Sequence, residues 1–134
     1  MGIPLYDITI YYDGHQNTEK SVEDEFMQTA NYVTKLYHKN LSGYKPPKTS
    51  RISITMGRAI QFLKPFYHGS ICVCSVIIDE EKYAQLSTQE RYKFILEILH
   101  KTIMNLAEIF NWDKNVFDKS YNQVLATNFK IEKA

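Results

Sequence analysis

Histidines, cysteines and clustered carboxylates are the side chains of this chain that could support catalysis or metal binding. The four histidines are His15, His38, His68 and His100. Their spacing contains neither a zinc pair nor an H-E-x-x-H sequence. Cys72 and Cys74 are separated by one residue, so in a strand both thiols point to the same face. We therefore expect two buried, reduced thiols rather than a disulfide or a zinc site.

A catalytic nucleophile would need an activating base and a polar setting. Cys72 lies in the apolar run 71–78, and a thiol buried among apolar side chains is normally inert. The carboxylates at 23–25 and 79–81 each open a predicted helical segment, where the helix dipole already favours negative charge. The chain contains no nucleophile-elbow, P-loop or dinucleotide-binding sequence. We expect no catalytic residue, cofactor or metal, and a protein that is not an enzyme.

The elements that position these side chains follow from the hydrophobic pattern, which predicts a single α+β domain over 1–134. Alternation predicts a strand at 3–12 and three antiparallel strands between 50 and 79, the second at about 60–67 and the third at 71–78. Helical spacing predicts helices over 21–40, 87–110 and 113–128. The order β-α-β-β-β-α-α favours a mostly antiparallel sheet of about four strands with three helices packed on it. Residues 130–134 are expected to fray.

Local signals indicate how the helices begin and which strands lie inside. Ser87 and Glu90 form a capping box at the start of the long helix. The run 71–78 is apolar on both faces, which predicts a central strand, and Pro65 predicts that the strand before it is an edge or is bulged. The stripe expected to be buried in the first helix consists of Val22, Phe26, Ala30, Val33 and Tyr37.

Bulk properties restrict the location and the class of partner. The formal net charge is +1 and the pI is about 7.7, which favours neither nucleic acid nor an anionic membrane. No run approaches the ~20 apolar residues of a membrane span. The first residues lack the basic segment and apolar run of a signal peptide. With reduced cysteines, these features predict a cytoplasmic protein without membrane contact.

Charge is distributed unevenly along the chain. Residues 1–25 contain six acids and one base, whereas residues 26–78 contain seven bases and no acid. Bases with aromatic neighbours can steer an acidic protein surface, bind phosphates, or simply form a solvated face. The predicted partner-binding surface consists of Tyr44, Lys45, Lys48, Arg51, Tyr67 and His68, because tyrosine and arginine often anchor interfaces. The competing acidic surface consists of Asp13, Glu19, Glu23, Asp24 and Glu25.

Residues 71–125 carry a family resemblance. A strand ends at Asp79, the sequence Ser87-x-x-Glu90-Arg91 opens an amphipathic helix through His100, and Asn111-Trp112-Asp113 separates it from a closing helix. This run resembles the small immunity proteins of bacterial polymorphic toxin and contact-dependent inhibition systems. The resemblance implies a cytoplasmic antitoxin that binds one cognate toxin domain tightly and blocks its active site or a nearby surface.

The resemblance leaves the chemistry of the toxin open. Many immunity proteins that neutralise nucleases present an acidic face, and the basic stretch 35–64 departs from that pattern. We therefore expect an inhibitory protein-binding function. One alternative is a small ligand-binding or enzymatic domain, with a pocket between sheet and helices lined by Tyr67, His68 or Cys74. A second is a nucleic-acid module that uses the basic stretch, although scattered bases and a near-neutral pI argue against it. The oligomeric state is not predicted.

Overall fold

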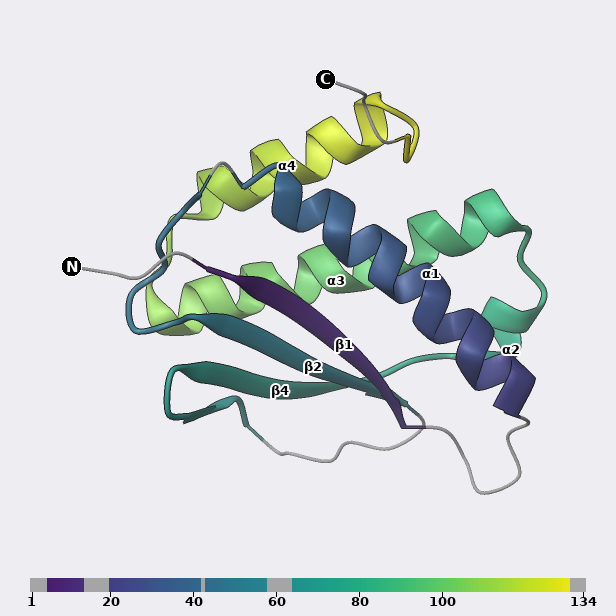
Figure 1. Ribbon diagram of the computed structural model, residues 1–134, viewed down its shortest axis with the longest axis horizontal. Helices are drawn as coiled ribbons and strands as arrows, with labels where there is room; N and C mark the ends of the chain where they lie inside the picture. The colour runs from purple at the N-terminus through teal and green to yellow at the C-terminus, as the bar shows by residue number, and fades with distance from the viewer. Residues whose placement is uncertain (1–4, 14–19, 42, 58–63, 131–134) are drawn as a thin grey trace.

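The computed structural model describes residues 5–13, 20–41, 43–57 and 64–130, and Figure 1 shows how their helices and strands are arranged. The strands are β1 (Asp7–Asp13), β2 (Arg51–Gly57), β3 (Phe66–His68) and β4 (Ile71–Ile77). The helices are α1 (Lys20–Lys39), α2 (Glu80–Ala84), α3 (Thr88–Phe110) and α4 (Lys114–Ala126). The α+β class is confirmed. The predicted strand residues 60–63 and the tail 131–134 lie outside the described ranges.

The sheet is mixed, so the prediction of a mostly antiparallel sheet is wrong. The strand order is β1-β2-β4-β3. β1 pairs with β2 and β2 pairs with β4 in parallel, and β3 alone pairs antiparallel, with β4. The cause is α1, which returns the chain to the starting edge before β2 begins, as parallel neighbours require. β4 is an inner strand and β3 an edge strand, which confirms those two predictions.

The described residues form four helices rather than the three predicted. The additional helix is α2, a segment of five residues in a stretch that the sequence indicated as a short connection with one helical turn. The side chain of Asp79 caps it by accepting a hydrogen bond from the backbone of Lys82 at 3.0 Å. The capping box of Ser87 and Glu90 is confirmed at the start of α3. Asn111, in the left-handed region with φ of 60°, ends that helix.

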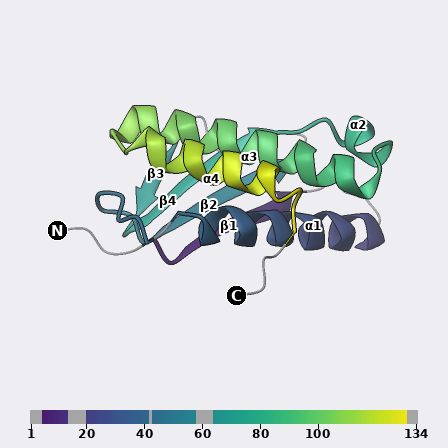
Figure 2. The same cartoon turned by 90° about the horizontal axis from the view of Figure 1, so that it is seen from above.

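The core lies on one face of the sheet. Even-numbered residues of β1, β2 and β4 are buried or half-buried, and the buried ones include Ile8, Ile10, Ile52, Ile54, Cys72 and Cys74. α1 runs beside β1 and contacts α3, and α4 packs against both of these helices (Figures 1 and 2). The predicted stripe of α1 is buried from Phe26 to Tyr37, but Val22 is 44% exposed. Val22 lies in the first turns of the helix, one turn beyond the buried residues.

The other face of the sheet is not covered by any described helix. It is formed by the odd-numbered residues of β1, β2 and β4, with Phe66 and His68 of β3. We call this surface the open face. Its side chains are exposed or half-buried, apart from Gly57. An antiparallel sheet commonly presents one such face to solvent, whereas parallel strands are usually covered on both faces.

Candidate partner-binding surfaces

Exposed charged side chains of the sheet and of α1 gather at the two edges where the parallel strands begin and end. Parallel strands begin at one edge of a sheet and end at the other. The starting edge carries exposed side chains of Lys39, Lys45, Lys48, Arg51 and His68, which we call the basic end. The finishing edge carries exposed side chains of Asp13, Asp24, Asp79 and Glu81, which we call the acidic end. α1 connects the two ends, and a helix of 20 residues is about 30 Å long.

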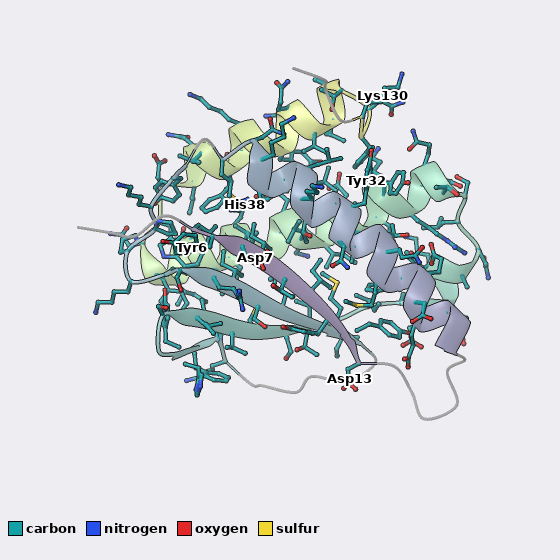
Figure 3. All side chains as sticks on the ribbon, viewed as in Figure 1. Tyr6, Asp7, Asp13, Tyr32, His38 and Lys130 are labelled. Carbon is teal, nitrogen blue, oxygen red and sulfur yellow. The ribbon has the colours of Figure 1, made fainter. Side chains whose placement is uncertain are left out.

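Figure 3 marks the two ends of β1, with Asp7 and His38 near its start and Asp13 at its end, so the basic end also carries the exposed carboxylate of Asp7. The separation is confined to the sheet layer and α1. On α3 and α4 the two signs alternate, and Lys114 forms an ion pair with Glu108. The molecule therefore has a charge gradient along its strands, although its net charge is only +1.

The loop of the basic end is held by hydrogen bonds at several points. The hydroxyl of Tyr44 accepts a hydrogen bond from the backbone of Asp113 at 2.8 Å. Thr49 donates to the carbonyl of Pro47 at 2.8 Å. The backbone of Ser50 donates to the carbonyl of Ser70 at 2.9 Å, which ties the start of β2 to the turn before β4. These bonds fix the backbone that carries the basic side chains.

The two tyrosines of the predicted surface support it from within. The ring of Tyr44 meets Phe117 edge-on, with centroids 5.7 Å apart, and the ring of Tyr67 meets Phe110 at 5.0 Å. The hydroxyl of Tyr67 lies 2.6 Å from that of Thr49. Burial, the largest effect, raises the pKa of Tyr67. Both side chains are half-buried, so most of their surface is already used by the protein itself.

The charged members of the predicted surface are exposed. Lys45 and Lys48 lie on the loop, Arg51 opens β2 and His68 ends β3. Arg51 and His68 share one row of the sheet, because each pairs with Ile71. Nε of Arg51 lies 3.7 Å from Oδ2 of Asp7, and both side chains are about half exposed (46% and 51%). An exposed pair of this kind contributes little to stability.

The predicted acidic surface is only partly available for contact. The carboxylate of Glu25 accepts hydrogen bonds from Tyr83 at 2.9 Å and Thr29 at 2.8 Å, and lies 3.2 Å from Arg91. Arg91 also stacks on the ring of Tyr83. Burial raises the pKa of Tyr83, with the bond to Glu25 acting in the same direction. Glu25 therefore helps to join α1, α2 and α3.

The exposed acidic residues at this end are not the same set as the sequence predicted. Asp13 and Asp24 are exposed and Glu23 is half-buried, whereas Glu19 lies outside the described residues. Asp79 and Glu81 join this end because β4 ends at the same edge as β1. Their grouping with Asp13 was not predicted, since it depends on the parallel pairing of the strands.

A series of polar contacts that runs from the buried Tyr37 to the exposed Asp118 links three helices, and sequence reasoning did not find it. The hydroxyl of Tyr37 lies 2.9 Å from Nδ1 of His100, and Nε2 of His100 lies 3.0 Å from Oδ1 of Asp118. The ring of Tyr121 stacks on the imidazole, with centroids 4.3 Å apart. Ser120 donates to the carbonyl of Tyr37 at 2.6 Å.

The burial of Tyr37 determines which group donates in each of the two hydrogen bonds of His100. Burial, reinforced by the charge of Asp118, raises the pKa of Tyr37, so its hydroxyl keeps its proton and can donate. Nδ1 of His100 then accepts, and Nε2 carries the hydrogen that points to Asp118. The arrangement resembles a catalytic triad in outline, but the hydroxyl at its inner end is fully buried. The hydrogen bonds among Tyr37, His100 and Asp118 therefore hold α1, α3 and α4 together.

The contacts of His38 and the burial of the two cysteines indicate a structural role. Nε2 of His38 donates to the carbonyl of Leu5 at 2.5 Å, and His15 lies outside the described residues. Cys72 and Cys74 are free and buried, which confirms the prediction for the thiols. Burial is the main cause that raises the pKa of Cys72 to about 11 and that of Cys74 to about 12. Neither thiol is ionised at neutral pH.

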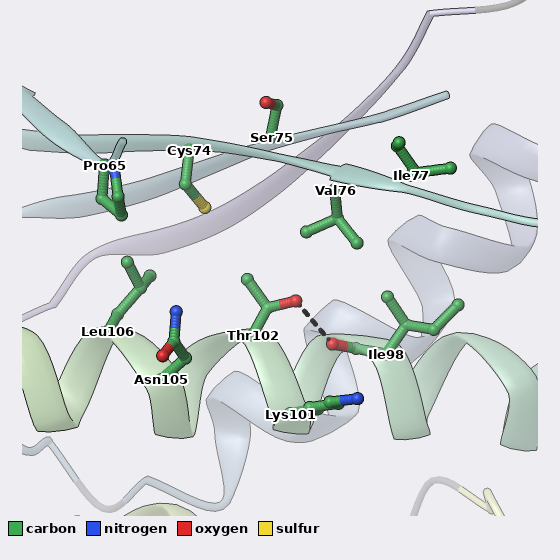
Figure 4. A pocket seen from close by; sticks show the side chains of 10 residues that line it. All are labelled: Pro65, Cys74, Ser75, Val76, Ile77, Ile98, Lys101, Thr102, Asn105 and Leu106. Carbon is green, nitrogen blue, oxygen red and sulfur yellow. Dashed lines mark hydrogen bonds between the residues drawn. The ribbon is translucent and has the colours of Figure 1, made fainter. Parts of the chain in front are cut away.

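A cavity of about 440 Å³ lies between β4 and α3 (Figure 4). Val76, Ile98 and Leu106 supply apolar walls, and Thr102 and Asn105 supply polar groups. Thr102 donates to the carbonyl of Ile98 at 2.7 Å. Of the three residues that the ligand-binding alternative placed in a pocket, Cys74 lines this cavity, and Tyr67 and His68 do not.

Within the described ranges, no cluster of three histidine, cysteine or acidic side chains is arranged to bind a metal ion. None of the described helices combines the length and the apolar character that crossing a membrane would require. Comparison with protein families, curated proteins and solved structures finds no match for the chain.

Proposed function

We propose that this protein binds another protein through its basic end and inhibits it, in the way of the immunity proteins that it resembles. The observation that carries the proposal is the combination of exposed Lys45, Lys48, Arg51 and His68 with a backbone held by internal hydrogen bonds. A loop that is ordered before binding loses less conformational entropy when the complex forms.

The sign of the charge indicates the partner. A concentrated positive surface accelerates encounter with an acidic surface and disfavours basic ones. The partner of the proposal is therefore a protein domain with an acidic patch around the surface to be blocked, such as a cognate toxin domain. The half-buried Tyr44 and Tyr67 shape the basic end, and the exposed cations make the contact.

Because the tyrosines support the loop and the cations make the contact, the variants change the cations. Tyr44→Ala would remove the hydrogen bond to Asp113 as well as any contact with a partner, so its effect could not be assigned. Lys45→Glu with Lys48→Glu changes exposed charge only. The matched control is Lys82→Glu with Lys93→Glu, which reverses two exposed lysines away from the basic end.

The experiment uses the product of the reading frame adjacent to this gene in the source genome. Expressed alone in a bacterial host, that product should arrest growth, and co-expression of this protein should restore it. With the purified pair, Lys45→Glu/Lys48→Glu should raise Kd at least tenfold, about 1.4 kcal/mol. The control pair should change Kd less than about twofold, under 0.5 kcal/mol. A Kd unaffected by the first pair, or no interaction at all, would refute the proposal.

The cavity between β4 and α3 favours a second candidate, the binding of a small ligand. A pocket with apolar walls and a few polar groups is the usual form of a ligand site. Thr102→Leu would narrow the cavity and remove its hydroxyl group while leaving the basic end unchanged. A metabolite that raises the thermal midpoint of the wild type but not of Thr102→Leu would support this candidate.

A further inference from the structure

The open face can be described in rows, because the strand register places particular side chains side by side. The first row contains Asp7, Arg51, Ile71 and His68. The second contains Thr9, Ser53, Val73 and Phe66. The third contains Tyr11, Thr55 and Ser75, and the fourth Asp13, Gly57 and Ile77. Hydroxyl side chains occupy the middle, with large apolar side chains around them.

The composition of this face suits contact with a protein surface. Tyr11, Phe66 and Ile77 are 49%, 41% and 54% exposed, and they account for half of the large apolar side chains exposed in the described residues. Such a grouping marks an interaction surface more often than isolated exposed residues do. Arg51, beside Asp7, is the single arginine or lysine on this face, which also carries His68. A surface for stacked nucleic-acid bases would need more positive charge than this.

We propose that the open faces of two copies of this chain pack against each other, with antiparallel strands, in a two-fold symmetric dimer. The charge gradient selects this arrangement. A two-fold axis perpendicular to the strands places the acidic end of one copy over the basic end of the other. An axis parallel to the strands would stack ends of like charge, which is repulsive.

Apart from Asp7, which opposes Asp13 of the second copy, the register makes the face complementary to itself in this arrangement. With the axis between the second and third rows, Tyr11 opposes Thr9 of the second copy, and Val73 opposes Ser75 of the second copy. A large side chain thus meets a small one, as interdigitated layers require. Ile71 opposes Ile77 of the second copy in an apolar contact. Every contact occurs twice, as in all two-fold interfaces.

Arg51 provides the main charge contact across the dimer. It opposes Gly57 of the second copy, and Gly57 is paired in register with Asp13. Arg51 is therefore placed between Asp7 of its own copy and Asp13 of the second copy. One base between two acids reduces their mutual repulsion, and the contact weakens as salt is added.

The size of the face predicts a weak dimer. Four strands of up to seven residues cover about 23 by 19 Å, or roughly 440 Å², at the usual strand spacings. Stable complexes bury about 800 Å² on each partner. We therefore expect a dissociation constant in the micromolar range or above. Arg51 belongs to this face and to the basic end, so dimerisation should compete with binding of the proposed toxin.

The test is analytical ultracentrifugation of the purified chain from about 5 μM to about 1 mM, a range that brackets micromolar affinity. The mass should rise from the 15.7 kDa of one chain towards twice that value. Ile77→Lys should remain monomeric, because it buries an ammonium group in the interface. The control is Ile109→Lys, which changes an isoleucine of equal exposure (52%) on α3 and should dimerise normally.

Arg51→Glu and added salt test the orientation of the strands. Both should weaken the dimer at least threefold, and circular dichroism should show that each variant is folded. A chain that stays monomeric throughout the range overturns the proposal, as does a dimer that Ile77→Lys does not weaken. A dimer strengthened by Arg51→Glu would overturn the antiparallel arrangement. None of these measurements uses the toxin, so they stand apart from the proposed function.

Discussion

The hydroxyl of Tyr37 on α1 lies 2.9 Å from Nδ1 of His100 on α3, with both rings in the interior of the helical layer. The imidazole continues to Asp118 on α4, so one histidine connects three helices. A polar group inside a core stabilises a fold only if its hydrogen bonds are satisfied. This pair therefore fixes the relative position of α1 and α3 more specifically than apolar packing alone.

Tyr37→Phe should lower the free energy of unfolding by about 1–3 kcal/mol, because it leaves the half-buried Nδ1 of His100 without a donor. The measurement is equilibrium unfolding in urea. Tyr11→Phe, which removes an exposed hydroxyl from the open face, serves as control and should change the value by less than about 0.5 kcal/mol. Equal effects of the two variants would show that the buried hydrogen bond contributes nothing.

Gly57→Ala should be strongly destabilising. A Cβ at this position would lie 2.3 Å from the backbone oxygen of Asp13, which cannot move without disturbing β1. The expected loss is about 3 kcal/mol, at the upper end of the cost of overpacking. Gly69→Ala is the comparison, since its Cβ meets no atom within 4 Å. Its positive φ should cost only about 1–2 kcal/mol.

The stability of both glycine variants would be measured by thermal unfolding and, independently, by unfolding in urea. If Gly57→Ala were no more destabilising than Gly69→Ala, the close approach of β1 and β2 at this row would be wrong. The result also bears on function, because Gly57 lets the end of β1 bring Asp13 to the acidic end.

Cys72 and Cys74 should react slowly with a thiol reagent in the native protein at pH 8. Burial raises their pKa values to about 11 and about 12, so little thiolate forms, and the side chains are inaccessible. In denaturant both thiols should react quickly, at a rate typical of exposed cysteine. Rapid reaction of either thiol in the absence of denaturant would contradict the buried, un-ionised state.

The capping box of α3 should make stability depend on pH. Hydrogen bonds from the backbone and hydroxyl of Ser87 lower the pKa of Glu90 below its usual 4.5. A carboxyl group whose pKa is lowered by folding stabilises the protein above the pKa it has when unfolded. That contribution is lost as the pH falls through the folded value. Glu90→Ala should therefore lower the thermal midpoint at pH 7, and the difference from wild type should shrink below about pH 4.5.

Gln89→Ala provides the control for this pH dependence, because the neighbouring position is exposed and uncharged. Its difference from wild type should be the same at pH 7 and at acidic pH. A difference for Glu90→Ala that also stays constant would mean that the hydrogen bonds to Ser87 do not favour the ionised carboxylate.

Comparison of prediction and structure shows that local features were found and long-range ones were not. The predicted helix 21–40 is α1, Lys20–Lys39, and the predicted helix 113–128 is α4, Lys114–Ala126. Helical periodicity and caps involve residues a few positions apart, so they can be read directly from the sequence. α2 was indicated only as one helical turn within a connection and was not counted as a helix, because five residues give a very short pattern.

Strand direction could not be obtained in the same way. A strand with one buried face alternates identically in parallel and antiparallel pairs, so Ile52 and Ile54 are compatible with both. The prediction assumed that consecutive strands are neighbours. Instead β3 lies outside β4, and β4 pairs with β2. Within the candidate surface, the sequence located the cations, but it could not show that Tyr44 and Tyr67 are committed to contacts with Phe117 and Phe110.

The amino-acid sequence by itself determined the α1, α3 and α4 helices, the capping box and the buried thiols, since each depends on residues close together in the chain. Only the tertiary structure decided the strand order, the chain from Tyr37 to Asp118 and the collection of charges at two ends of the sheet. These features require residues far apart in sequence to meet. These long-range contacts depend on the packing of the whole core, which no local sequence pattern predicts.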